Sequence, residues 1–119
     1  MARLKKVECV EIVGIGKIPL KEGTFRPSGE KRETKMSTCN AKDSGFVGTN
    51  ESAQLKMTVL SHGYMDAQTL HRQDNAQITV TLAGGHQHIM YPAWSTEPPE
   101  EKDGEFEITF ESGTSERLQ

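Results

Sequence analysis

The most regular pattern of apolar and polar positions lies near the end of the chain. Residues 105–111 alternate strictly, with one apolar face (Phe106, Ile108, Phe110) and one mainly acidic face (Glu105, Glu107, Thr109, Glu111). Because successive side chains of a β-strand point to opposite faces of a sheet, this pattern predicts a strand with one buried face. The acidic face is expected to meet water or a wet cavity.

Five further segments are predicted to be strands. Residues 4–13 are rich in β-branched side chains, 17–25 form the return strand, and 54–60, 77–82 and 86–94 complete the set. Gly14 and Gly16 offer a turn after the first strand, and Gly84-Gly85 is a two-residue hairpin signal between the last two. Pro19 has no N–H to donate, so its strand is expected at a sheet edge or at a bulge.

Residues 65–72 are predicted to form a short helix. Asp66 can cap its first turn, and Met65 can contact Leu70 as a hydrophobic staple. Strands separated by one short helix indicate a mainly β fold, an antiparallel β-sandwich or open barrel with one short α-helix. The length of 119 residues favours a single domain over 1–119.

Residues 26–52 interrupt the pattern of apolar positions. They hold Pro27, Gly29, Gly45 and Gly48 among many Ser, Thr, Lys and Glu residues, and no hydrophobic period is visible. The segment is therefore predicted to be a long polar loop. Loops of this length are uncommon in compact domains and are usually functional or ordered by a partner.

The composition indicates a thin hydrophobic core. Apolar residues make up 34% of the chain, and Leu, Ile, Val and Phe together fall just under the roughly 20% at which disorder becomes a consideration. The net charge of −3 is too small for a disordered chain. A thin core in a short chain favours stabilisation by a partner, often a second copy of the same chain.

Charge is unevenly distributed along the chain. Residues 1–35 carry nine Lys or Arg against five Asp or Glu, whereas residues 97–119 carry two against eight. Opposite ends of two copies could therefore attract each other, or the two segments could neutralise one another within one subunit. The acidic total and the lack of a basic patch interleaved with aromatic residues argue against nucleic-acid binding.

No motif indicates an enzyme, a cofactor or a membrane segment. Gly14-x-Gly16 lacks the third glycine and the helix of a dinucleotide loop, and no nucleophile elbow is present. Cys9 and Cys39 have no metal or redox spacing and are expected to be free thiols. Residues 75–96 lack charge but are too polar to span a membrane, and the N-terminal residues do not have the pattern of a secretory signal.

One pair of residues supports an alternative interpretation. His86-x-His88 places two imidazoles on one face of a strand, where they could bind a metal ion. The first carboxylate after them is Glu97, further along the chain than such a site would need. A small β-barrel that binds a ligand or metal is the alternative to a self-associating β domain.

The order and spacing of several segments resemble the tail tube protein of Mu-like contractile-tailed bacteriophages, which is related to bacteriocin and type VI secretion tube proteins. The resemblance covers most of residues 14–117. It is carried by Gly23–Arg26, Arg32–Thr34, Ser44–Val47, Ala53–Lys56, Thr69–Val80 and Asp103–Phe110.

The resemblance implies a structural subunit and no enzyme. Such proteins form hexameric rings with a continuous inner β-barrel, and the rings stack into a hollow conduit for DNA ejection inside a contractile sheath. The implied partners are copies of the chain, the sheath, the tape-measure protein, and baseplate and tail terminator proteins. DNA would pass without specific binding, no cofactor is implied, and the location would be the virion tail, with assembly in the host cytoplasm.

Particular residues are predicted to serve this role. Glu105, Glu107 and Glu111 are expected to line an acidic lumen that repels phosphates, or alternatively to lie on the outer wall against the sheath. Contacts between subunits or rings are expected at Arg26, Arg32 and Phe46 in or beside the segment 26–52, and at Leu55 and Met57 as barrel-strand packing.

Overall fold

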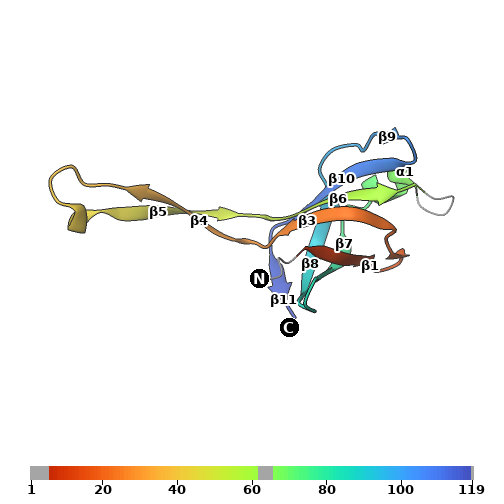
Figure 1. Cartoon of the computed structure of the whole chain (residues 1–119), viewed down its shortest axis with the longest axis horizontal. Helices are drawn as coiled ribbons and strands as arrows, with labels where there is room; N and C mark the ends of the chain where they lie inside the picture. Colours follow the sequence, from red (N-terminus) through yellow and green to blue (C-terminus); the bar gives the residue numbers. More distant parts are fainter. Residues whose placement is uncertain (1–5, 62–65, 119) are drawn as a thin grey trace, which may run out of the picture.

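The computed structural model describes residues 6–61 and 66–118, which form a β-rich body with one long arm (Figure 1). The arm gives the molecule its extended shape, with principal extents of 63 × 35 × 28 Å. The strands of the body are β1 (Val7–Ile12), β2 (Gly16–Lys17), β3 (Leu20–Arg26), β6 (Ala53–Leu60), β7 (Ala76–Leu82), β8 (Gln87–Ser95), β9 (Glu101–Lys102), β10 (Glu105–Ser112) and β11 (Ser115–Arg117). The body also contains the helix α1 (Ala67–His71), and the arm contains β4 (Gly29–Lys35), β5 (Gly45–Glu51) and the 3₁₀ helix η1 (Ala41–Asp43).

The body strands form one antiparallel sheet in the order β2-β1-β7-β8-β10-β6-β3, with β9 and β11 attached to its side. The sheet curls, because β1 and β3 lie near each other although they belong to opposite ends of this order. A Cβ built on Gly23 of β3 would lie 3.5 Å from the Cβ of Val7 on β1. The prediction of an antiparallel β-sandwich or open barrel with one short helix is confirmed.

The core lies inside this curled sheet and is built from the alternating positions of its strands. Phe106, Ile108 and Phe110 of β10 are buried, as their pattern predicted, and Leu55 is fully buried on the neighbouring strand. Leu70 of α1 adds a buried side chain to the same cluster. The core is therefore formed by the single apolar face of each of these strands.

Two local signals act as predicted. Gly84 and Gly85 connect β7 to β8 with φ values of +100° and +90°, which glycine adopts without strain. Asp66 caps α1, since its carboxylate accepts a hydrogen bond of 3.1 Å from the backbone N–H of Gln68. Met65, the predicted staple residue, lies outside the described residues.

The segment 26–52 is not the loop that the sequence predicted. Its two halves pair as the antiparallel strands β4 and β5, which extend from the body as a two-stranded arm (Figure 1). Every residue of β4 is exposed, so no hydrophobic alternation marks the strand in the sequence. A two-stranded ribbon with water on both faces has the backbone of a β-strand, but neither face selects apolar side chains. The alternation of apolar and polar residues that usually marks a strand is therefore missing.

The arm is a continuation of a hairpin that begins in the body. The antiparallel pairing of β3 with β6 continues into the pairing of β4 with β5 in the same register. No residue is inserted or deleted between the two pairs of strands. The paired positions are Gly23 with Met57, Arg26 with Gln54, Gly29 with Glu51, and Lys35 with Gly45. Pro27 lies at the junction, where its missing N–H interrupts the ladder. The buried pairs of the body therefore set the register of the exposed arm.

A similar interruption divides β10 from β11. Both strands pair with β8 in one register, in which Ser112 lies opposite Ala93 and Ser115 opposite Met90. The break falls opposite Pro92, which cannot donate to a ladder. After the break, Ser115 lies beside Ser28, which precedes β4 at the base of the arm.

Candidate interaction surfaces

One face of the arm holds a chain of three side chains. Residues opposite each other on an antiparallel pair share a face, and here Thr34 lies opposite Phe46 and Arg32 opposite Gly48. The Arg32 guanidinium lies over the Phe46 ring, 4.9 Å from its centroid, and the Arg32 Nε donates to Oε1 of Glu30 over 3.1 Å. The arginine is thus held in place on an exposed ribbon.

Gly48 provides the space for this arrangement. A Cβ at this position would lie 2.5 Å from Cδ of Glu30, so the glutamate side chain occupies the place that a larger residue would fill. The other arm face carries a second local pair, in which Nζ of Lys35 donates to Oε1 of Glu33 over 2.8 Å. Several charged side chains of the arm are therefore paired with each other within the arm.

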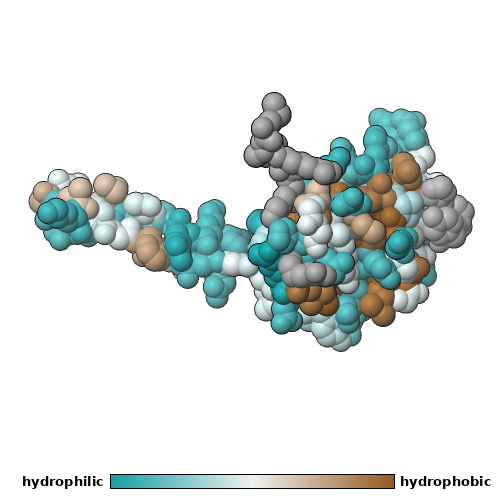
Figure 2. Space-filling model, turned by 60° about the horizontal axis from the view of Figure 1, so that its bottom comes forward, coloured by the Kyte–Doolittle hydropathy of each residue, from teal (hydrophilic) through white to brown (hydrophobic). Residues whose placement is uncertain are grey.

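The arm also exposes apolar side chains toward its far end. Met36, Phe46 and Val47 are 67%, 58% and 54% exposed. The space-filling view shows a mainly hydrophilic arm with scattered hydrophobic positions, beside a body with larger hydrophobic areas (Figure 2). An arm with little internal burial and exposed apolar side chains is suited to packing against another protein surface.

The base of the arm is tied to the body by side-chain hydrogen bonds. Nη2 of Arg26 donates to the backbone oxygen of Ser52 over 3.0 Å, across the two strands. Oγ of Ser52 donates to Oε1 of Glu111 over 3.3 Å. The serines 28 and 115 bond to each other in both directions. These contacts fix the direction in which the arm leaves the body.

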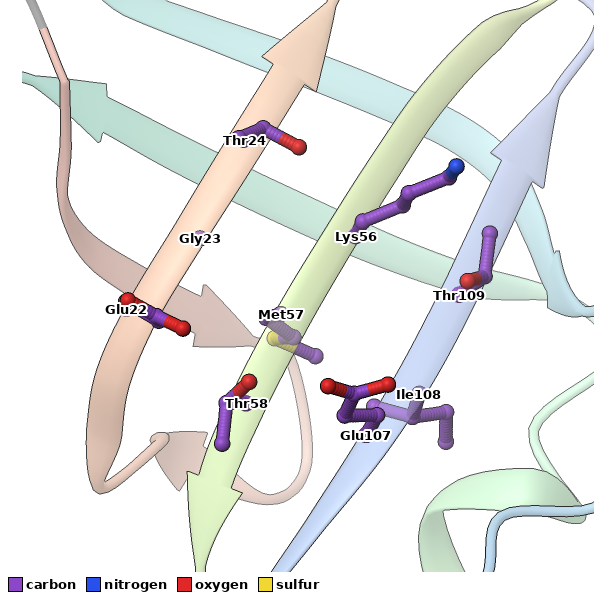
Figure 3. A pocket seen from close by; sticks show the side chains of 9 residues that line it. All are labelled: Glu22, Gly23, Thr24, Lys56, Met57, Thr58, Glu107, Ile108 and Thr109. Carbon is purple, nitrogen blue, oxygen red and sulfur yellow. The ribbon is translucent and has the colours of Figure 1, made fainter.

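The outer face of β3, β6 and β10 forms a polar surface on the body (Figure 3). It surrounds a shallow hollow of about 350 Å³. The polar side chains that line it are Glu22, Thr24, Lys56, Thr58, Glu107 and Thr109, whereas Met57 and Ile108 on the same strands are buried in the core. The side chains on this face are charged or carry hydroxyl groups, so the face is suited to contact with water.

The three predicted carboxylates of β10 share this face of the strand. Glu107 is exposed, and Glu105 and Glu111 are half-buried. Oε2 of Glu105 accepts a hydrogen bond of 2.9 Å from Nζ of Lys21. This hydrogen bond and the charge of Glu105 raise the pKa of Lys21 above the ordinary lysine value.

A second hollow lies where β9 turns into β10, at the end of the body away from the arm (Figure 1). It has a volume of about 600 Å³. Its lining holds four carboxylates and one lysine, together with Phe106, and the charged members are Glu100, Asp103, Glu105, Glu107 and Lys102. We call this site the acidic hollow.

The structure separates the five predicted interface residues into two groups. Arg26, Arg32 and Phe46 are exposed on or beside the arm, where a partner can reach them. Leu55 and Met57 are 0% and 3% exposed and pack inside the body. The prediction of subunit contacts through these two residues is corrected, because the curled sheet of their own chain encloses them.

The histidine pair has contacts with other side chains. The His88 ring lies 4.9 Å from the Phe25 ring, and His86 Nδ1 is close to the Arg117 guanidinium. Within residues 6–61 and 66–118, no group of three or more His, Cys, Asp or Glu residues is placed to hold a metal ion. The same residues include no helix with the length and apolar character needed to cross a membrane.

Sequence reasoning missed the Glu30–Arg32–Phe46 chain and the serine pair at the arm base, and it named Glu105 and Glu107 of the acidic hollow without predicting the hollow itself. Glu30-x-Arg32 and Glu33-x-Lys35 did carry a signal, since opposite charges two residues apart share a strand face. Nothing in the sequence connects Ser28 with Ser115, which are 87 residues apart.

These features define a class of protein: a small β-sandwich body with an exposed two-stranded arm and an acidic hollow at the opposite end. The chain belongs to the family of phage tail tube proteins, whose family model matches residues 1–117. Its role is therefore structural, as a component of the virion tail tube. No match to a curated protein was found.

Solved structures of contractile injection systems have the same fold. The chain is similar to the sheath/tube terminator of an extracellular contractile injection system (PVC), with 12% identity, a TM-score of 0.69 and coverage of 93% of this chain and 92% of that one. The tube terminating cap of the anti-feeding prophage gives 8% identity, a TM-score of 0.66 and coverage of 100% and 95%. A chain of the PVC sheath-tube complex gives 13% identity, a TM-score of 0.64 and coverage of 92% of this chain and 86% of that one.

Proposed function

We propose that six copies of this chain form a ring and that rings stack into the hollow tail tube. The arm is the main observation in support of this proposal, because it lengthens the molecule to 63 Å and is exposed along both strands. A single subunit gains little from such an arm, whereas a stack of subunits can bury it. The open edges of the curled sheet, β3 and β2, offer backbone groups through which neighbouring subunits can close an inner barrel.

The outer face of β3, β6 and β10 is proposed to line the lumen. Its polar lining, with Glu105, Glu107 and Glu111 on one strand, suits a wet channel. Carboxylates at the wall would repel DNA phosphates, so that DNA slides through without binding. Replacing Glu107 with lysine should slow DNA ejection in assembled tails, and unchanged ejection would contradict the lumen assignment.

The partners follow from the position of a tube in a tail. A sheath around the tube and a terminator at its end are supported by the neighbouring structures, which come from a sheath-tube complex and from tube terminators. A tape-measure protein inside the tube, a baseplate at its start and assembly in the host cytoplasm complete the proposal. The role requires no catalytic step.

Negative-stain electron microscopy of the purified protein tests the tube directly. We expect rings or hollow tubes of uniform diameter at high protein concentration. If charge holds the stack together, tubes should shorten at high salt, since salt screens exposed charges. A protein that stays monomeric at every concentration, even when purified baseplate is added to start assembly, would contradict the proposal.

A further inference from the structure

We propose that Lys56 gives the wall of the tube one row of phosphate-binding side chains, which holds DNA weakly while it passes. The inference rests on the proposed function and adds a residue that contacts DNA on the proposed lumen face. It begins from the register of β3, β6 and β10, which places side chains in rows across the three strands.

Two neighbouring rows of this face carry opposite charge, because residues opposite each other on antiparallel strands share a face. Thr58 of β6 lies opposite Glu22 of β3 and Glu107 of β10, and both carboxylates are exposed. We call these three residues the carboxylate row. Two residues away along β6, in a row about 7 Å from the first, Lys56 lies between two threonines. The proposed lumen is therefore banded in charge and not uniformly acidic.

Lys56 is an exposed cation that forms no ion pair with any residue that the structure describes. The other two cationic residues of β3, β6 and β10 are already engaged. Nζ of Lys21 lies 2.9 Å from Oε2 of Glu105. Nη2 of Arg26 donates to the backbone oxygen of Ser52 over 3.0 Å. Figure 3 shows the Lys56 side chain extending away from the carboxylate row, so its ammonium can meet a negative charge in the lumen.

The row around Lys56 contains hydrogen-bond donors and no carboxylate. Thr24 and Thr109 lie on either side of the lysine, one on β3 and one on β10 (Figure 3). An ammonium and two hydroxyls can all donate, and lysine and threonine are among the side chains that contact DNA phosphates. Phosphate oxygens of the DNA backbone only accept. The row therefore matches DNA better than a protein surface, which presents donors as well as acceptors.

The carboxylate row keeps this contact weak. Two negative charges lie in a row about 7 Å from one positive charge, which is within the roughly 8 Å over which exposed charges interact in physiological salt. Phosphates are attracted at one row and repelled at the next, so DNA is held briefly and then moves on. Contacts to phosphate carry no sequence information, in agreement with the passage of any DNA sequence.

DNA ejection from tails built with variant subunits tests the role of Lys56. A contact that neutralises one phosphate weakens about 3.5-fold between about 50 mM and 200 mM salt. We expect Lys56→Gln to speed ejection by about twofold or more at low salt, and its difference from the wild type to shrink as salt rises. Lys56→Arg keeps the charge and should eject DNA at the wild-type rate.

Lys21→Gln is the matched control, since it removes the same charge from the same face, but from a cation already paired with Glu105. It should change the ejection rate much less than Lys56→Gln does. Unchanged ejection in Lys56→Gln, or an equal change in Lys21→Gln, would overturn the inference. If Lys56→Gln alters tail length and leaves ejection unchanged, the row contacts a protein inside the tube and the DNA inference is wrong.

A cysteine on the same face separates a failure of this inference from a failure of the proposed lumen. Thr24→Cys is made in a chain whose free cysteines, Cys9 and Cys39, are both replaced by serine. In intact tubes it should react with a small maleimide and be protected from a maleimide too large to enter the tube. Labelling by the large reagent would place this face on the outer wall and refute the lumen assignment. If the wild-type protein forms no tubes, the proposed tube itself fails.

Discussion

Ser28 and Ser115 hold each other by hydrogen bonds in both directions. The backbone N–H of Ser28 donates to Oγ of Ser115, and the backbone N–H of Ser115 donates to Oγ of Ser28, both over 2.9 Å. Their hydroxyl oxygens lie 3.2 Å apart. The pair connects the first residues of the arm with β11, so the C-terminal strand takes part in setting the arm's direction.

Replacing either serine with alanine should loosen the base of the arm. Each change removes a hydroxyl acceptor from a half-buried N–H, which costs about 1–2 kcal/mol in the free energy of unfolding. Hydrogen exchange measured by mass spectrometry should speed up in β4 and β5 and at β11, with the core of β10 unchanged. A threonine at position 115 keeps the hydroxyl and should retain most of the protection. Unchanged exchange in Ser28→Ala would contradict a role for the pair.

The two phenylalanines at 110 and 46 should respond differently to truncation. Phe110 is fully buried, so Phe110→Ala should lower the free energy of unfolding by about 3–5 kcal/mol. Phe46 is exposed on the arm, so Phe46→Ala should change it by less than about 0.5 kcal/mol. Urea unfolding measures both. Phe46→Ala should nevertheless weaken tube assembly, because Arg32 loses the ring beneath it. A large stability loss in Phe46→Ala would contradict this division.

The Lys21–Glu105 pair should give a pH dependence at alkaline pH. Glu105 raises the pKa of Lys21 above its ordinary value of 10.5, so the pair favours the charged lysine in the folded protein. Its contribution to stability is therefore complete below the unfolded-state pKa and is lost as pH rises through the higher folded-state pKa. The urea midpoint should fall between pH 9 and pH 12 more steeply for the wild type than for Lys21→Met. Equal slopes would contradict the pairing in solution.

The turn at Gly84 should not tolerate a side chain. A Cβ there would touch nothing within 4 Å, so the cost comes from the backbone alone, at φ +100°. We expect Gly84→Ala to destabilise the fold by about 1–2 kcal/mol, the cost of left-handed backbone for an L-residue. Gly29→Ala is the control, since its surroundings are equally open and its φ lies outside the left-handed range. Thermal unfolding compares the two, and equal midpoints would count against this explanation.

The sequence by itself determined the elements that bury one face. The alternation in β10 predicted both a strand and its buried residues, because the hydrophobic effect acts on every second side chain of an extended chain. The glycine pair between β7 and β8 and the Asp66 cap were also local, since their chemistry involves only neighbouring residues. These parts could be predicted without the rest of the fold.

Only the tertiary structure decided what the arm is and where the acidic hollow lies. The arm buries almost nothing, so its strands carry no hydrophobic period, and its register is inherited from the buried pairs of β3 and β6. Leu55 and Met57 could have packed against a neighbour, and the curl of the sheet placed them inside their own subunit. The hollow is lined by residues 100–107 of one hairpin, and only the fold places this hairpin at the end of the body opposite the arm. Such distant relationships depend on how the sheet curls, which no local pattern of side chains specifies.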